Sequence, residues 1–287
     1  VFDSLCVGAS VQHPERREML APLVDAIERG VAEHRFRAEH LIHLRCEITD
    51  PQTPALAHAH LDRATVRLVS VMDHTPGDRQ SPDVERWLRA TSKAMQVSLE
   101  EGRAALEELL ERSARVGAGV EAEVIGLAQQ HGLPVMSHDD RTEAHVDAAC
   151  AAGVRVSEFP TTLAAARRAR TTGLGIVAGA PNILRGGSQS GNVAVRELLA
   201  EGLVDALASD YVPRSPLEAA FAIADDPSLP ITLPQAIAMV TATPARLAGL
   251  ADRGSLALGQ RGDLVRVRRM SGRCHVVAVW RAGRRVF

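Results

Sequence analysis

The chain has 287 residues, of which 46% are hydrophobic, 24% are charged and only 3% are aromatic, and its formal net charge is −2. This composition is ordinary for one globular domain of barrel size with a buried core. The near-neutral charge and the scarcity of aromatic side chains argue against nucleic-acid binding. No window reaches the roughly 18 continuous apolar residues of a membrane span, and no signal peptide opens the chain. We therefore expect a cytoplasmic protein without a membrane partner.

Seven short apolar runs recur along the chain, and each ends abruptly in polar or ionisable residues. This pattern is typical of a parallel strand that emerges from a core into a site. Residues 133–136 run into Ser137 and His138, and residues 68–72 run into Asp73 and His74. The other runs end at Ser4, Glu47, Glu158, Asn182 and Asp210. Because the chain begins with Val1 inside the first of these runs, we expect an N-terminally truncated chain.

Helix-forming segments at residues 143–152, 162–170 and 193–201 alternate with these runs. Alternation of strand and helix predicts a parallel α/β fold, most simply a (β/α)8 barrel. Residues 81–130 are strongly helical and exceed the length of one barrel helix, so we expect an inserted helix there, capped at residues 81–83.

The pattern changes after residue 250, where short alternating segments are separated by glycines. Residues 254–256, 259–267 and 275–280 are predicted strands. We therefore predict a barrel over residues 1–250 and a small C-terminal β appendage over residues 251–287. The four cysteines are scattered along the chain, which favours reduced thiols over a disulfide framework.

Candidate chemistry lies at the predicted strand ends, because barrel active sites form at the carboxyl ends of several strands. Histidine and carboxylate ligands together suit zinc or manganese, and such a metal lowers the pKa of a bound water while an aspartate accepts the proton. Each residue also has a structural interpretation: His138 as a hydrogen-bonded group, Glu47 as a partner of a helix N-terminus, Asp210 as a turn cap. The strand-end set is Glu47, Asp73, His74, His138, Asp139, Glu158 and Asp210.

A glycine-rich stretch at residues 179–192 contains Asn182, Arg185 and Ser188 and precedes a predicted helix. A loop of this kind presents backbone N–H groups to an anion, typically a phosphate. Further arginines near strand ends favour a polyphosphate substrate, although each is alternatively a solvated surface charge. They are Arg79, Arg141 and Arg214.

The order of these motifs resembles the amidohydrolase superfamily, and within it the diphosphatases of the carbon–phosphorus lyase pathway of phosphonate degradation. The resemblance runs essentially end to end. It implies a distorted (β/α)8 TIM barrel, here lacking its first strand, with a tail that completes a small β-sandwich. The motifs are His-Leu-Arg-Cys-Glu at 43–47, Met-Asp-His-Thr-Pro-Gly at 72–77, Ser-His-Asp-Asp at 137–140, Glu-Phe-Pro-Thr-Thr at 158–162, Gly-Ala-Pro-Asn at 179–182, Arg-Gly-Gly-Ser at 185–188 and Ala-Ser-Asp-Tyr at 208–211.

The resemblance also implies an activity, which is hydrolysis of a ribose 5-triphosphate to the 5-phosphate and pyrophosphate with one or two divalent ions, zinc or manganese. Asp210 would accept the proton of the metal-activated water, and His74 would be a ligand or a transition-state stabiliser. The implied metal ligands are Glu47, His74, His138 and Asp210. The implied substrate-binding residues are Arg79, Arg141, Asn182, Arg185, Gly186, Gly187 and Ser188.

The chain departs from the superfamily pattern at three points. The His-x-His pair of the first strand is absent, Glu158 stands where many members have a histidine, and Gln189 stands where we expect a loop histidine. Two alternatives stay open: an amidohydrolase that cleaves a C–N bond, such as a deaminase or deacetylase, and a non-catalytic scaffold. A C–N hydrolase would not need several arginines at the site. Assembly as a homo-oligomer also stays open.

Overall fold

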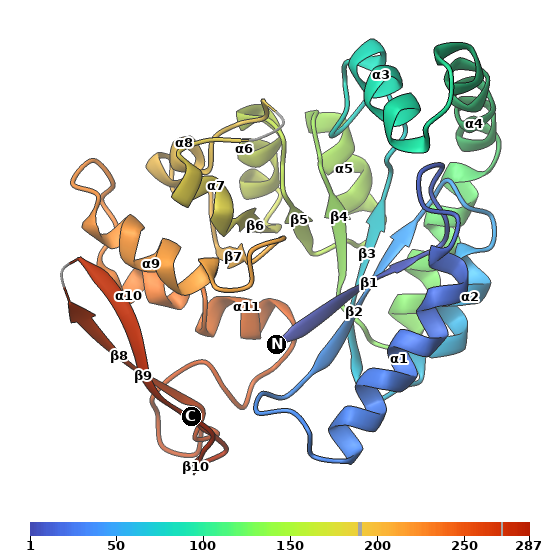
Figure 1. Cartoon of the computed structure of the whole chain (residues 1–287). Helices are drawn as coiled ribbons and strands as arrows, with labels where there is room; N and C mark the ends of the chain where they lie inside the picture. The colour runs from blue at the N-terminus through green and yellow to red at the C-terminus, as the bar shows by residue number, and fades with distance from the viewer. Residues whose placement is uncertain (189–190, 271) are drawn as a thin grey trace.

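The computed structural model describes residues 1–188, 191–270 and 272–287, and at its centre is one curved sheet of parallel strands (Figure 1). The strands lie in chain order, and each pairs in parallel with the next. Within the described ranges β1 and β7 each have one partner, so the sheet forms a half-barrel. The predicted α/β barrel architecture is thereby confirmed. The strands are β1 (Phe2–Val7), β2 (Leu41–Glu47), β3 (Val66–Met72), β4 (Val135–His138), β5 (Val156–Glu158), β6 (Gly175–Gly179) and β7 (Ala206–Ala208).

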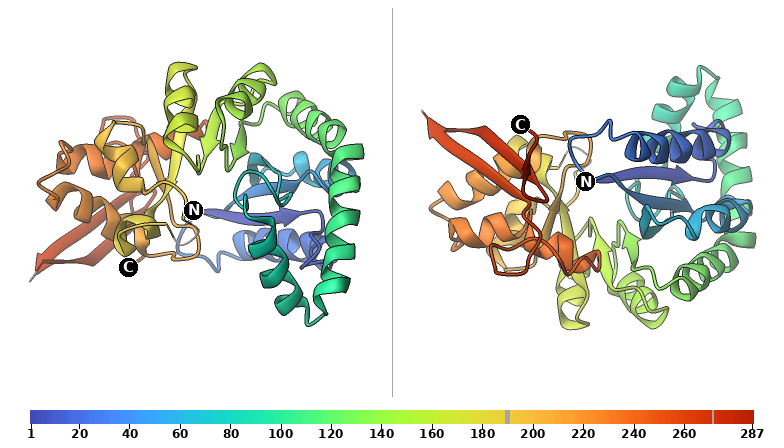
Figure 2. Two further views of the ribbon diagram at one scale, coloured as in Figure 1. Left: turned by 90° about the horizontal axis from the view of Figure 1, so that it is seen from above. Right: turned by 90° about the horizontal axis from the view of Figure 1, so that it is seen from below.

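Helices that connect the strands cover the outer face of the sheet (Figure 2). The connection between β3 and β4 holds the longest helix, as the sequence predicts. The left-handed Gln96 (φ 58°) ends the preceding helix, and a capping box at Ser98 starts the long one. The helices are α1 (Arg16–Ala32), α2 (Thr53–Leu61), α3 (Val84–Met95), α4 (Leu99–Gln130), α5 (Glu143–Ala151), α6 (Leu163–Thr171), α7 (Ala180–Arg185), α8 (Val195–Ala200), α9 (Ser215–Asp225), α10 (Leu233–Ala238) and α11 (Ala242–Leu247).

The core has two layers because side chains alternate across each strand. In β2, Ile42, Leu44 and Cys46 are fully buried against the outer helices. The inner face of the half-barrel carries a smaller apolar layer, which consists of Leu68, Met136, Val156, Val177 and Ala206. The same alternation places His43, Arg45 and Glu47 on the inner face, so β2 delivers its polar groups to the site.

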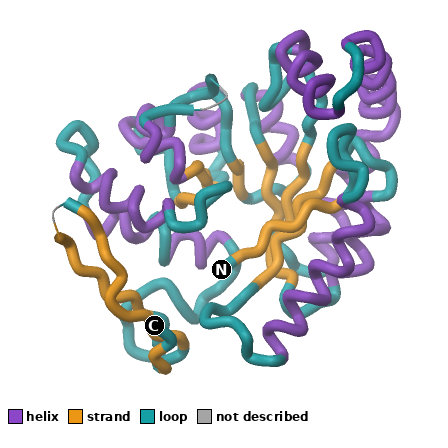
Figure 3. The backbone as a smooth tube through the Cα atoms, viewed as in Figure 1, coloured by secondary structure: helices purple, strands orange, loops and turns teal. Residues whose placement is uncertain are grey.

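A separate antiparallel sheet of three strands follows the barrel (Figure 3). It comprises β8 (Leu264–Met270), β9 (Arg273–Arg281) and β10 (Arg284–Arg285), which confirms the predicted β appendage. The predicted strand at residues 254–256 is wrong, since this segment is a bend. Gly254 has φ +100°, and a Cβ there would lie 2.7 Å from Ala242 Cα, so the chain turns closely over α11 at this point.

None of the helices among the described residues is long and apolar enough to cross a membrane.

Candidate metal centre

Glu47 and His74 meet where β2 and β3 end. Glu47 Oε2 lies 2.6 Å from His74 Nδ1, and Thr49 Oγ1 donates to Glu47 Oε1 at 2.9 Å. Burial alone would raise the pKa of Glu47, but the hydrogen bonds from His74 and Thr49 outweigh it and hold that pKa below its usual value. The ionised carboxylate accepts the Nδ1 proton of His74, which leaves a lone pair on Nε2 for a cation.

His138, the last residue of β4, has a partner at each ring nitrogen. Its Nδ1 lies 2.8 Å from Asp139 Oδ2, and its Nε2 lies 2.9 Å from Arg45 Nη2. Because a guanidinium group only donates, Nε2 of His138 accepts this bond with its lone pair, and a metal ion bound at Nε2 would have to displace Arg45. Burial alone would lower the pKa of His138, but the carboxylates of Asp139 and Glu158 raise it above the usual value. Those carboxylates would favour a metal cation in the same way.

Three residues that lie just after strands, within two positions of the strand end, have left-handed backbones. They are Asp139 after β4 (φ 56°), Phe159 after β5 (φ 56°) and Asp210, two residues after β7 (φ 48°). This conformation is uncommon outside glycine and tends to persist at functional sites, where the surrounding structure imposes it. The Asp139 N–H donates to the Glu158 carbonyl at 2.9 Å, and this bond holds the turn that brings the Asp139 side chain back beside His138.

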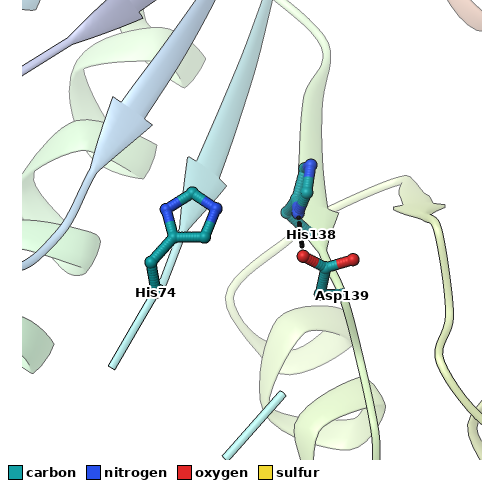
Figure 4. Close-up of side chains that lie close together, drawn as sticks. All are labelled: His74, His138 and Asp139. Carbon is teal, nitrogen blue, oxygen red and sulfur yellow. Dashed lines mark ion pairs between the residues drawn. The ribbon is translucent and has the colours of Figure 1, made fainter. Parts of the chain in front are cut away.

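His74, His138 and Asp139 form a cluster of metal-ligand type (Figure 4). One ligand atom from each lies within 4.8 Å of the others. Asp139 Oδ2 and Glu158 Oε2 are buried without a hydrogen bond in the described part of the chain, although Asp139 Oδ2 is within ion-pair distance of His138. Burial raises the pKa of Glu158, and the charges of Asp139 and Asp210 act in the same direction. Nitrogen and oxygen ligands with buried, unsatisfied carboxylate oxygens fit a divalent cation.

Asp210 lines a cavity next to this cluster, together with Asp139, Asn182, Arg185 and Tyr211. Burial raises the pKa of Asp210 and the charge of Asp139 adds to this, while Arg45 and His138 oppose it. A raised pKa makes a carboxylate a stronger base near neutral pH. Asp210 therefore lines the cavity from the segment after β7, with the electrostatics of a proton acceptor.

Asn182 and Arg185 reach this cavity from a short helix, α7, where the sequence predicts a loop. Asn182 Oδ1 accepts the Val195 N–H at 3.0 Å, and the Arg185 guanidinium lies 5.5 Å from the Tyr211 ring centroid and donates to its hydroxyl. Gly186 (φ 83°) ends the helix in the left-handed conformation.

The N–H groups of Gly186 and Gly187 both donate to the Asn182 carbonyl, so these glycines cap α7. Ser188 lines the cavity. Gln189 and Ser190 of the predicted anion-binding stretch lie outside the described residues.

The model of the amidohydrolase family matches residues 27–287. The chain belongs to the amidohydrolase family. It is 41% identical over all 287 residues to the alpha-D-ribose 1-methylphosphonate 5-triphosphate diphosphatase of Escherichia coli K12, of which it covers 76%. The superfamily prediction is therefore confirmed, and with it the prediction of a hydrolase.

Two solved structures show the fold. The dihydropyrimidinase of Brevibacillus agri aligns with a TM-score of 0.51 at 10% identity, over 99% of this chain and 75% of its own. An uncharacterised metal-dependent hydrolase from Pyrococcus horikoshii aligns with a TM-score of 0.51 at 13% identity, over 86% of this chain and 57% of its own.

Two predicted substrate residues of this amidohydrolase lie apart from the cavity. Arg79 Nη1 donates to Asp140 Oδ1 and to the His138 carbonyl, each at 3.0 Å, so it braces the end of β4. Asp140 is fully buried and also accepts from the hydroxyls of Ser137 and Ser157. The backbone of Arg141 continues this turn, and its side chain does not line the cavity. Substrate contact by Arg79 and Arg141 stays a prediction.

The predicted ligand set and the observed cluster overlap without being identical. His74 and His138 belong to both, Glu47 bonds to His74, and Asp210 lines the adjacent cavity. The sequence places Asp139 among the strand-end residues but does not predict it as a ligand. Its place directly after a strand-end histidine is the signal in the sequence, because a left-handed turn there returns the side chain to the site.

Proposed function

We propose that this amidohydrolase is a metal-dependent diphosphatase of phosphonate catabolism that hydrolyses alpha-D-ribose 1-methylphosphonate 5-triphosphate to the 5-phosphate and pyrophosphate. The observation that carries the proposal is the 41% identity with the Escherichia coli enzyme of that name over the whole of this chain. The ligand cluster at the strand ends supports it, because it fits a cation that a phosphoryl-transfer site would use.

His74, His138 and Asp139 would hold a divalent ion, zinc or manganese. The carboxyl groups of Glu158 and Asp210 interact electrostatically with His138 and Asp139, and they would complete the site or hold a second ion. When bound, such an ion polarises a phosphoryl oxygen and lowers the pKa of a water molecule. Glu47 keeps His74 in the tautomer with a lone pair on Nε2, and that positioning is its role in the proposal, whether or not it is also a ligand.

Asp210 would accept the proton of the attacking water. It lines the cavity that Asp139 also lines, and burial raises its pKa towards the range where a carboxylate is an effective general base. Its left-handed backbone fixes the carboxylate after β7. The proton would therefore have an acceptor in the cavity that Asp139 of the ligand cluster also lines.

The triphosphate would lie in the cavity that Arg185, Asn182 and Ser188 line. Arg185 offers a cationic group whose plane can pair with phosphate oxygens, and its contact with Tyr211 orients it towards the cavity. Arg79 would act by bracing β4, and Gly186 and Gly187 by setting the turn that carries Ser188 into the cavity.

Cleavage of a C–N bond is the competing activity, since the same ligands and Asp210 would serve it. The dihydropyrimidinase likeness does not favour it, because at 10% identity it shows the fold alone. The relative named as a diphosphatase is far more similar.

The protein is first stripped of metal and reloaded with manganese or zinc. Two activities are then compared: release of pyrophosphate from the ribose triphosphate, and hydrolysis of a dihydropyrimidine, measured as ring opening or ammonia release. We expect turnover of the triphosphate alone. Asp210→Asn should lower kcat about 10²- to 10⁴-fold, whereas the surface variant Asp147→Asn should not change it. Ring opening without pyrophosphate release would refute the proposal.

A further inference from the structure

A second cavity is lined by His74. It is formed by the carboxyl ends of β1, β2 and β3, by the segment that leads into α1, and by α3 and α4. Gln80 lines both cavities, His74 lines the second and Asp139 lines the first. The metal cluster therefore contributes one residue to each cavity, and the proposed triphosphate site occupies the first. The second is lined by Cys6, Ser10, Val11, Gln12, His13, Arg16, Arg45, Glu47, Thr49, Met72, His74, Gln80, Ser81, Trp87 and Leu109.

The polar part of this second cavity is cationic. Arg16, the first residue of α1, is half-buried, and its guanidinium forms no hydrogen bond or ion pair with any residue that the structure describes. The carboxylates of the adjacent Glu15 and of Glu47 in the same cavity wall have other hydrogen-bond partners. Glu15 pairs with His13 at 3.0 Å, and Glu47 accepts from His74 and Thr49. An arginine in a cavity wall that no carboxylate binds directly favours an anionic ligand.

Another part of the cavity lining is apolar. Met72 and Leu109 are buried, and Trp87 is partly buried. Such a wall suits a methyl group or a sugar ring and is a poor surface for a pyrophosphate group with several charges. The first cavity, by contrast, brings together Arg185, Asn182 and Ser188. The two cavities thus differ in the ligand chemistry they fit.

We infer that the second cavity binds the sugar end of the substrate and that Arg16 pairs with an anionic methylphosphonate group at C1, whose methyl faces Trp87 and Leu109. This inference rests on the proposed function, which supplies a substrate with anionic groups at both ends. The triphosphate then extends past the metal cluster into the first cavity. Arg16 is a specificity-determining residue in this arrangement, because it distinguishes a sugar with an anionic C1 substituent from one without.

The experiment compares kcat/KM for the complete substrate with kcat/KM for ribose 5-triphosphate, which has only a hydroxyl at C1. The wild-type protein should prefer the complete substrate. Arg16→Gln should reduce that preference about 10- to 100-fold, as expected for loss of a charge-assisted contact, and Arg16→Lys should restore part of it. Arg89→Gln, at an exposed arginine of α3 that lines neither cavity, should leave the preference unchanged.

An equal loss on both substrates, or no loss on either, would overturn the inference. A failure of the proposed function is recognised separately, because the wild-type protein would then release pyrophosphate from neither triphosphate. In that case calorimetric binding of ribose 1-methylphosphonate to the metal-loaded protein decides. Binding that Arg16→Gln weakens tenfold or more supports the subsite, and equal binding by both proteins refutes it.

Discussion

At the residue scale, the proposed metal site consists of the ring nitrogens of two histidines and one carboxylate. His74 follows β3 by two residues and His138 ends the neighbouring β4, and each has one ring nitrogen beside a carboxylate, Glu47 or Asp139. A histidine whose other nitrogen is fixed in this way is a better metal ligand, since its tautomer and orientation are already set. The same buried carboxylates would supply negative charge around a bound cation.

His138→Ala should therefore weaken metal binding at least about tenfold, because it removes one of the three proposed ligands. The measurement is zinc or manganese content by elemental analysis after gel filtration in a defined concentration of competing chelator. His58→Ala, at an exposed histidine of α2, is the matched control. Equal metal content in the two variants would show that the cluster is not the metal site.

At the element scale, Asp50 ties the connection after β2 to the start of α1. Its buried carboxylate pairs with both Arg17 Nε at 2.6 Å and Arg17 Nη2 at 2.7 Å, and it also accepts the Ala9 N–H at 2.6 Å. Burial alone would raise the pKa of Asp50, but the bonds from Arg17 and the backbone outweigh it, so that pKa lies below 3.8. This contact holds the loop that forms part of the second cavity.

Asp50→Asn should lower the free energy of unfolding at pH 7 by about 2 kcal/mol, because the bidentate pair is lost while Arg17 keeps some contact with water. The folded-state pKa is depressed, so the contribution is complete above the ordinary pKa near 3.8 and declines as the pH falls towards the folded value.

Urea unfolding at pH 7 and below pH 3.8 checks this. The difference in the free energy of unfolding between wild type and Asp50→Asn should become smaller in acid. The variant Asp62→Asn, at an exposed carboxylate, should change the free energy of unfolding little at either pH. A difference in the free energy of unfolding that becomes larger in acid would contradict the stabilising role of the Asp50–Arg17 pair.

The strands were predictable because alternation and apolar runs are local properties. Glu47, His74 and His138 were found at strand ends for the same reason. Asp139 was not assigned as a ligand, because its left-handed turn depends on the N–H bond to Glu158 in the next strand, a pairing that local pattern does not contain.

The structures of two segments were predicted wrongly for a similar reason. The first residues of the glycine-rich stretch form α7 because the N–H groups of Gly186 and Gly187 bond back to Asn182 and end a helical turn there. Residues 254–256 alternate like a strand, yet Gly254 is packed on Ala242, so no neighbouring strand can pair with them. Tertiary contacts override local propensity at both places.

At the scale of the whole molecule, Glu39 joins the C-terminal segment to the half-barrel. Glu39 precedes β2 and pairs with both Arg253 and Arg261, the latter at 2.7 Å. Arg281 of β9 adds bonds to the Phe36 and Ala38 carbonyls at 3.2 Å. Burial alone would raise the pKa of Glu39, but the two arginines outweigh it and lower that pKa. Ion pairs and arginine–carbonyl hydrogen bonds therefore hold the C-terminal segment against the loop that precedes β2.

Glu39→Gln should loosen this attachment by about 1 kcal/mol without a change in kcat, since each arginine keeps a second carboxylate, Asp252 or Asp263. Hydrogen exchange in β9 should become about fivefold faster at neutral pH, and the difference should shrink in acid, where wild-type Glu39 is protonated. Glu33→Gln, at an exposed carboxylate before the same loop, is the control. Unchanged exchange in β9 would show that the clamp contributes nothing.

The whole molecule also offers the most direct test of function, because the two products of the proposed reaction have distinct phosphorus spectra. The measurement is phosphorus-31 NMR of the manganese- or zinc-loaded protein with alpha-D-ribose 1-methylphosphonate 5-triphosphate. We expect stoichiometric pyrophosphate and 5-phosphate, with no signal from released orthophosphate and no turnover after the metal is removed. Orthophosphate with a 5-diphosphate, or an unchanged substrate spectrum with metal bound, would contradict it.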